Sequence, residues 1–324
     1  MAVDGTARVG VRRRAPRLLD REGVLGGVLV APAVFVVVLF LVLPIILAAA
    51  MAFMRIDLTR SADWTFFGLG NFAQIRLDPV LFETIPRTLY YAFAATTLTL
   101  LAGVSASLFL NERFRGQRTL RIIALLPWAV APIATGVTWK LIFHFLYGLL
   151  NAVLFSLGLI PRYIGWLEDP FLAFHAAILA YVWLAVPFVS LILLARLQGI
   201  PAQLYKAAMV DGASTWNRFR YVTFPAVRET VVILLLFQFI VSMQTFDLVY
   251  SLTKGGPGDA TTVISMVIYN RAFDELRLGY ASALAMLLFL ITTAVLGTAF
   301  VLARRARRTG ASVPAETVAA ESGA

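Results

Sequence analysis

Six apolar stretches constrain this chain more than any other feature of its sequence. Each is at least about as long as the roughly 20 residues that a helix needs to cross a bilayer. Because hydrocarbon offers the backbone no hydrogen-bonding partner, a segment that crosses it must be helical. The sequence therefore predicts an all-α polytopic membrane protein with six transmembrane helices, over residues 23–54, 86–110, 122–146, 171–197, 230–252 and 280–302.

The basic residues are distributed unevenly between the two sides of this arrangement. If both termini lie on one side, that side carries 19 of the 28 Lys and Arg residues, and the other side carries 8. The acidic residues divide almost evenly, 8 against 9. Since basic residues concentrate on the cytoplasmic side of membrane proteins, both termini are predicted to be cytoplasmic. The net charge of +10 is thus assigned to membrane topology, and no nucleic acid partner is expected.

One six-span domain, residues 23–303, lies between two polar tails. Residues 1–22 carry six arginines, and residues 304–324 carry four more before an end rich in Ala, Ser and Glu. Both tails are predicted to be disordered and cytoplasmic. The first apolar stretch has the basic flank of a signal peptide but is too long for one, so it is predicted to remain as an uncleaved first span.

A polar segment, residues 199–225, separates the fourth and fifth apolar stretches and predicts two short helices lying against the membrane. Pro201 suits a first helical position, since its missing N–H would be unpaired there. A helix is expected over 202–210 and ends at Gly212, which can adopt the left-handed conformation of a helix terminus. Ser214 is then the expected cap of the second short helix.

Motifs for catalysis are missing from the sequence. There is no cysteine, no G-x-x-x-x-G-K-[ST] phosphate-binding loop and no H-E-x-x-H motif. The two histidines, His144 and His175, are isolated at span ends. We therefore expect that the chain is not an enzyme, has no metal site and carries no cofactor.

Polar residues inside an apolar span are costly and mark candidate functional positions. Gln238, Ser242 and Thr245 follow an i, i+4, i+7 spacing and therefore share one face of the predicted fifth helix. They could bond neighbouring helices or line a pathway for a hydroxylated solute, and spacing alone does not separate these readings. Lys140 and Asp247, near the outer ends of their spans, are expected to snorkel or to pair with each other.

Three sequence blocks resemble those of a known family. They are KAAMVDGASTWNRFRYVTFP (206–225), FDLVYSLTKGGPGDATT (246–262) and YNRAFDELRLGYASALA (269–285). Together and in this order they resemble the permease subunits of binding-protein-dependent ABC importers, of the carbohydrate or maltose type and most like the first of the two permeases. The first block matches the "EAA" coupling loop of that family.

The resemblance implies a function and a set of partners. The chain would form the translocation pathway for a sugar, polyol or oligosaccharide in the bacterial plasma membrane. It would pair with a second permease subunit and with two copies of a cytoplasmic ATPase subunit, which would bind the ATP and Mg²⁺. An extracytoplasmic solute-binding protein would deliver the substrate.

The resemblance also implies site residues, matched by motif. The coupling contacts would be Lys206, Ala207, Ala208, Asp211 and Gly212, where the family usually has Glu in place of Lys206. The substrate pathway would use the fourth and fifth spans at Tyr181, Leu184, Ala185, Phe188, Gln238, Ser242 and Thr245.

Two other functions compete with this one. A secondary, ion-coupled transporter would work without an ATPase, but it normally shows ion-coupling carboxylates or broken helices near the bilayer centre. A membrane-anchored DNA-binding protein is suggested by two short helices joined at a glycine, yet the segment lies between two membrane spans. The importer permease is favoured over both.

Overall fold

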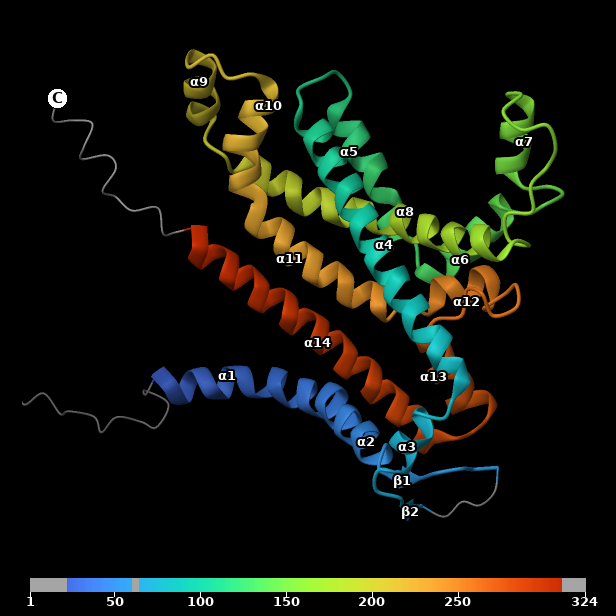
Figure 1. The fold of residues 1–324 in the computed structure, drawn as a ribbon. Coiled ribbons are helices and arrows are strands. Elements are labelled where there is room, and N and C mark those ends of the chain that lie inside the picture. The colour runs from blue at the N-terminus through green and yellow to red at the C-terminus, as the bar shows by residue number, and fades with distance from the viewer. Residues whose placement is uncertain (1–21, 60–63, 311–324) are drawn as a thin grey trace, which may run out of the picture. The chain divides into compact units, whose positions relative to one another are not determined.

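The computed structural model describes residues 22–59 and 64–310, which are helical almost throughout (Figure 1). They fall into two compact units that divide between Met51 and Ala52, and each is described separately. The predicted tails lie outside the described residues, apart from Glu22 and the residues 304–310 that continue the last helix. The elements are α1 (Glu22–Val37), η2 (Val38–Val42), α2 (Leu43–Met51), β1 (Met54–Arg55), β2 (Thr65–Phe66), α3 (Gly70–Ile75), α4 (Pro79–Asn111), α5 (Gln117–Leu125), η3 (Leu126–Ala129), α6 (Pro132–Ile142), α7 (Leu149–Ser156), α8 (Pro170–Gln198), α9 (Ala202–Val210), α10 (Thr215–Arg218), η4 (Phe219–Thr223), α11 (Phe224–Met243), α12 (Asp247–Thr253), α13 (Ile264–Tyr269), η5 (Asn270–Asp274) and α14 (Leu278–Gly310).

The first unit is one apolar helix, formed by α1, α2 and the π-helical turn η2 between them. Its membrane-spanning part runs over 23 residues, Leu29–Met51. Pro32 lies inside α1 without ending it. The first predicted span is therefore present as a helix.

Four long helices form the main body of the second unit: α4, α8, the continuous helix Thr215–Met243 and α14. Each is longer than the roughly 20 residues needed to cross a bilayer. Asp78 and Asp169 cap α4 and α8, where each carboxylate accepts a hydrogen bond from a backbone N–H of the first turn. The prediction of an all-α polytopic chain is confirmed.

The third predicted span is not a straight helix. The segment Gln117–Ala129 meets α6 at a bend of 100°. Pro132 begins α6, and the residue before a proline is pushed out of the helical region, as the extended backbone of Ala131 shows. Among the described residues, five helices are long and apolar enough to cross a membrane, or six if this bent pair counts as one span.

The fifth predicted span differs from the structure at both ends. The second short helix expected after Ser214 is the start of the span itself, because α10 continues through the π-helical turn η4 into α11. The helix then ends at Met243 instead of at Leu252. Gln244 and the next two residues are not helical, and α12 follows as a separate helix.

Helices α4 and α8 pack closely because small residues lie between them. A Cβ added to Gly103 of α4 would lie only 2.9 Å from Cβ of Val189. Val189 is fully buried, in a cluster with Leu193 of α8 and Leu234 of α11. A glycine at this position lets the two helix backbones approach closely, as small residues do between transmembrane helices.

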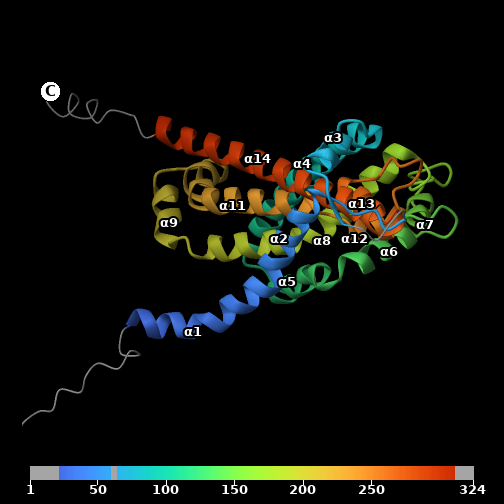
Figure 2. The ribbon, with the colours of Figure 1, turned by 90° about the horizontal axis from the view of Figure 1, so that it is seen from below.

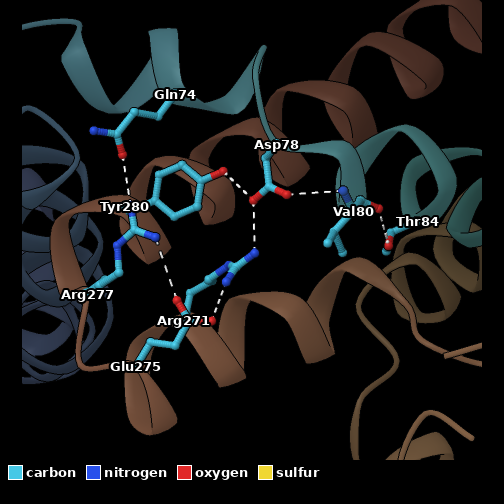
Figure 3. A network of polar contacts seen from close by, with 8 residues as sticks. All are labelled: Gln74, Asp78, Val80, Thr84, Arg271, Glu275, Arg277 and Tyr280. Atoms are coloured by element: carbon cyan, nitrogen blue, oxygen red, sulfur yellow. Dashed lines mark hydrogen bonds and ion pairs between the residues drawn. The ribbon is translucent and has the colours of Figure 1, made fainter. Parts of the chain in front are cut away.

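At one end of the second unit, polar side chains join the starts of α4 and α14 (Figure 3). The Asp78 carboxylate caps α4, accepts a hydrogen bond from the Tyr280 hydroxyl at 2.8 Å and pairs with Arg271 at 3.1 Å. Arg271 also pairs with Glu275. Burial lowers the pKa of the Arg271 guanidinium, but the carboxylates of Glu275 and Asp78 raise it more, so the net pKa lies above its usual value.

When the bent pair of α5 and α6 is counted as one span between α4 and α8, consecutive spans of the second unit alternate in direction (Figure 1). The C-terminal ends of α8 and α14 and the start of α11 lie at the end where α9 is found, while α6, α7 and α12 lie at the opposite end of α8 (Figures 1 and 2). This alternation is what consecutive membrane spans require. Segment 199–225 therefore lies at one end of the bundle. The turn at Gly255–Gly258, which follows α12, lies at the opposite end.

The packing of α6 on α12 generates a testable prediction. A Cβ on Gly136 of α6 would lie 2.5 Å from the backbone carbonyl oxygen of Leu248, which cannot turn away as a side chain can. We expect Gly136→Ala to destabilise the protein by about 1–3 kcal/mol. The measurement is the thermal unfolding temperature in detergent micelles.

The matched control is Gly297→Ala, since Gly297 is also in a long helix and has no atom within 4 Å of an added Cβ. This variant should unfold at the same temperature or slightly higher. Equal unfolding temperatures for Gly136→Ala and wild type would contradict the close packing of α6 on α12.

Candidate functional site

A cavity of about 550 Å³ is enclosed by α8, α11, and the two places where a predicted span is broken. Its size falls in the range of small-molecule sites in proteins. Val130 and Pro132 line it from the bend between η3 and α6, and Gln244 lines it from the break between α11 and α12. The two interrupted spans thus meet at one cavity, because α6 packs against α12.

One wall of the cavity carries a buried polar pair. The Gln238 side-chain amide of α11 donates a hydrogen bond to the Tyr181 hydroxyl of α8 at 2.9 Å. Both side chains are buried, at 3% and 5% exposed. The Tyr181 hydroxyl keeps a proton that it can donate, so the pair can still bond a further polar group in the cavity.

Aromatic rings form another part of the wall. Phe188 of α8 lies between Trp128 of η3 and Phe237 of α11, with ring centroids 5.7 and 5.4 Å away. Trp128 and Phe237 remain about half exposed. Flat apolar surfaces next to a few polar groups suit a ligand that has both apolar faces and hydroxyl groups.

Six of the seven predicted pathway residues line this cavity. They are Tyr181, Leu184, Ala185, Phe188, Gln238 and Thr245. The seventh, Ser242, is 1% exposed and lies elsewhere. Its hydroxyl is 3.1 Å from the Thr96 hydroxyl of α4 and 3.4 Å from the Ala92 carbonyl oxygen.

The predicted polar stripe is therefore divided. Thr245 lies beyond the end of α11, so the i, i+4, i+7 spacing does not continue to it as a helical face. Ser242 bonds α4, and Gln238 bonds Tyr181 of α8 while it also lines the cavity with Thr245. Bonding between helices is therefore observed for Ser242 and Gln238, and a pathway role for Gln238 and Thr245 stays a prediction.

Sequence reasoning missed Trp128, Gln244 and Asp247 as cavity residues. The signal for Trp128 was present, because Pro127 and Pro132 bracket it and mark a broken span. Gln244 and Asp247 become accessible only because α11 ends at Met243. In the described part of the chain no ion pair joins Asp247 to Lys140, so the expected mutual pair is not formed.

The segment 199–225 begins with a helix at the predicted bounds, residues 202–210. Pro201 precedes that helix instead of opening it, and its carbonyl oxygen accepts from the Leu204 N–H at 3.1 Å. Gly212 has φ of +74°, the left-handed conformation that was predicted to end the helix. The N–H of Gly212 bonds the Met209 carbonyl, and the next N–H bonds the Ala208 carbonyl.

Helix α9 presents most of its surface to the outside. Of the five predicted coupling residues, Lys206, Ala207, Asp211 and Gly212 are exposed, and Ala208 is half-buried. Large apolar side chains are exposed too, with Leu204 at 51%, Met209 at 52% and Val210 at 88%. Exposed apolar side chains gathered on one helix are typical of surfaces that contact a protein or a membrane.

A single side-chain hydrogen bond is described between α9 and the span that follows. The Tyr205 hydroxyl lies 2.9 Å from the Thr223 hydroxyl of η4. Ser214 caps α10 by accepting a hydrogen bond from the Asn217 N–H. The end of α9 is therefore joined to the start of the fifth span through a short turn and this bond.

The match to a family model covers residues 96–308, two thirds of the chain. The model is described as "Binding-protein-dependent transport system inner membrane component". The matched range includes α9, the cavity and most of the four long helices of the second unit.

Two curated proteins are similar over most of their length. The trehalose/maltose transport system permease protein MalF of Thermococcus litoralis is 37% identical, over 85% of this chain and 92% of that protein. The sulfoquinovosyl glycerol transport system permease protein SmoG of Agrobacterium fabrum is 35% identical, over 87% of this chain and 91% of that protein.

Among solved structures, a chain of a bacterial ABC transporter involved in the import of the acidic polysaccharide alginate has a similar fold. The TM-score is 0.76, with 22% identity, over 89% of this chain and 97% of that chain. This likeness supports the arrangement of the helices described above.

The cavity can be tested by thiol labelling, because the chain has no cysteine of its own. Gln244→Cys places a thiol at an exposed cavity residue, whereas Ser242→Cys places one at a buried residue two positions away. We expect a water-soluble maleimide to label Cys at 244 at least about tenfold faster, since the thiolate must meet the reagent. Mass spectrometry of the intact protein measures both rates, and equal rates would contradict the cavity geometry.

Proposed function

The chain belongs to the family of binding-protein-dependent transport system inner membrane components, and we propose that it forms the translocation pathway of an ATP-driven importer for a sugar, polyol or oligosaccharide. As an inner membrane component with several membrane-spanning helices, it is a multi-pass protein of the bacterial plasma membrane. The cavity at the two helix breaks is the observation that carries the proposal.

The chemistry of the cavity supports a sugar as the solute. The rings of Trp128, Phe188 and Phe237 offer apolar surfaces on which a sugar ring can lie. The Tyr181–Gln238 pair, Gln244 and Thr245 offer donors and acceptors for its hydroxyl groups. The two curated relatives are named as transport proteins for trehalose/maltose and for sulfoquinovosyl glycerol, which are carbohydrate solutes.

The proposed importer requires other subunits. The sequence carries no phosphate-binding loop, so ATP and Mg²⁺ would be bound by two copies of a cytoplasmic ATPase subunit. The family description names a binding protein, which would deliver the solute from outside. A second permease subunit would complete the pathway.

Helix α9 would dock into the ATPase subunit through its exposed surface. A short helix ended by a left-handed glycine is a compact body that can transmit a displacement. The Tyr205–Thr223 bond gives that displacement a direct route to the fifth span, whose other end lines the cavity. The contacts would be made by Lys206, Ala207, Ala208, Asp211 and Gly212.

Lys206 departs from the acidic residue usual in this family. Its side chain is exposed, and so are the apolar side chains of Met209 and Val210. Exposed ion pairs contribute only about 0–1 kcal/mol, whereas burying a Val or Met side chain contributes about 1.5–3 kcal/mol. We infer that this subunit docks mainly through the apolar surface of α9, so that the reversed charge at Lys206 is tolerated.

The secondary transporter remains the alternative to be tested. Broken helices, which that function predicts, do occur at the cavity. Asp247 is the carboxylate that lines it, and its side chain lies in the first turn of α12. The family description, with its binding protein, favours the importer.

Reconstitution into proteoliposomes separates the two functions. We expect uptake of a labelled sugar by the complex of this chain, its partner permease, the ATPase and the binding protein, and only with ATP inside. Removal of the ATPase should abolish uptake. Uptake that persists without ATPase and follows an ion gradient would establish the secondary transporter instead.

Cavity variants serve as internal controls in the same assay. Gln238→Ala and Thr245→Ala remove polar groups from the cavity and should each raise KM about two- to tenfold, since a lost hydrogen bond costs about 0.5–1.5 kcal/mol. Ser242→Ala removes a hydroxyl outside the cavity and should leave KM unchanged. Unchanged KM in all three variants would reject the proposed pathway residues.

Docking through α9 predicts that a charge on its apolar surface prevents binding to the ATPase subunit. Val210→Asp puts a charge on the most exposed apolar side chain of the helix and should prevent co-purification with the ATPase, without changing the thermal unfolding of the isolated chain. Val210→Leu keeps the surface apolar and should bind normally. Lys206→Glu should also bind normally, and loss of binding in that variant alone would show that the charge at this position governs docking.

A further inference from the structure

An apolar groove of about 310 Å³ runs along the last turns of α4, between α8 and the start of the fifth span. It is separate from the cavity described above and shares no residue with it. Leu101, Val104 and Leu108 line it from α4, Leu197 from α8 and Phe224 from α11.

The hydroxyl groups in this groove are already engaged. Ser105 bonds the Leu101 carbonyl, and Ser107 bonds the Val104 carbonyl one turn earlier in α4. The Thr223 hydroxyl is shared with Tyr205. A molecule bound in the groove would therefore meet an apolar surface, because these hydroxyl groups already have hydrogen-bond partners.

A second pocket, of about 410 Å³, lies beyond the end of the groove and is basic. Arg113 and Arg121 line it together with the amide side chains of Asn111, Gln117 and Gln198. No carboxylate is present among its lining residues, all of which are described. Arg113 is exposed, and so are Arg115 and Arg118, which do not line the pocket.

Arg121 is held in place by backbone and side-chain partners. Its Nε and Nη2 donate to the Leu110 carbonyl oxygen at 3.2 and 2.8 Å, at the C-terminal end of α4. With the Gln198 amide oxygen turned toward it, Arg121 also donates to that oxygen at 3.1–3.2 Å. No carboxylate neutralises this guanidinium in the described ion pairs, so its positive charge remains available to an anion.

The groove and the basic pocket adjoin each other. Leu197 lines both. Val104 and Leu108 line the groove and Asn111 lines the pocket, and these three residues follow one face of α4 at i, i+4, i+7. The Tyr205 ring lines the pocket, while its hydroxyl bonds Thr223 in the wall of the groove.

We propose that the groove and the basic pocket together bind one anionic phospholipid, with its phosphate headgroup at Arg113 and Arg121 and an acyl chain along α4. The basic pocket suits the charged headgroup, and the adjoining apolar groove suits the acyl chain. Arginine binds phosphate oxygens well because its planar group donates several hydrogen bonds. Basic pockets between helix ends at a membrane interface favour anionic headgroups.

Two simpler occupants fit the structure less well. A free phosphate would use the basic pocket but leave the apolar groove unfilled. A partner protein would have to present an acidic side chain at the pocket and a row of apolar side chains along ten residues of α4, about 15 Å at 1.5 Å per residue. A single phospholipid carries both features, and its acyl chain has that length.

The test is lipid binding by the purified importer complex in detergent, followed by native mass spectrometry. The probes are dioleoylphosphatidylglycerol, dioleoylphosphatidylcholine and glycerol phosphate. We expect the complex to bind phosphatidylglycerol at least about tenfold more tightly than phosphatidylcholine, and glycerol phosphate far more weakly, because it has no acyl chain. Arg113→Gln should weaken phosphatidylglycerol binding about fivefold.

The matched control is Arg118→Gln, which removes the same charge from the exposed side of α5 outside the pocket lining. It should bind phosphatidylglycerol as the wild type does. Arg113→Lys should restore most of the affinity lost in Arg113→Gln, which separates headgroup recognition from misfolding.

Three results would overturn the proposal. Equal weakening by Arg113→Gln and Arg118→Gln would mean diffuse attraction to a basic surface. Glycerol phosphate that binds as tightly as the lipid would mean a phosphate site without use of the groove. Binding by the isolated chain that disappears in the assembled complex would mean that a partner subunit covers this surface.

Discussion

The backbone at the two helix breaks is the constraint on which the site depends. A carbonyl or N–H group left unpaired by a break costs several kcal/mol in hydrocarbon, so breaks are tolerated only where protein or water meets them. Here each break has a partner nearby: the Val130 N–H bonds the Pro127 carbonyl, and the Ser265 hydroxyl bonds the Thr245 carbonyl. Both breaks also lie at the same cavity, where solvent can form hydrogen bonds with the backbone groups that have no partner in the protein.

The packing around the breaks explains why they persist. Gly136 lets α6 approach α12, and Gly103 lets α4 approach α8, so the helices beside the breaks are closely packed. The network of Asp78, Arg271 and Tyr280 joins the starts of α4 and α14 by charge-assisted hydrogen bonds (Figure 3). At the other end of the bundle, the hydrogen bond between Tyr205 and Thr223 joins α9 to the fifth span.

Much of the site could be predicted from the sequence, for reasons that particular residues make clear. Tyr181, Phe188 and Gln238 lie on regular helices and line one cavity, which agrees with the common face that spacing and motif predicted. Ser242 and Thr245 were harder, because their roles depend on where α11 ends and on how near α4 approaches. The end of α11 has no proline or glycine beside it, so no local residue predicts where this helix ends.

Apolar length and charge distribution determined the class of this protein, because the bilayer imposes the same length and the same helical backbone on every span. The sequence of 202–214 likewise determined a helix, its glycine end and the next cap, since these are local effects. Only the tertiary structure decided that α11 ends at Met243, that this break meets the one beside Pro132, and that Trp128 and Gln244 share a cavity with Gln238. Those facts rest on contacts between helices far apart in the chain, which periodicity and composition do not contain.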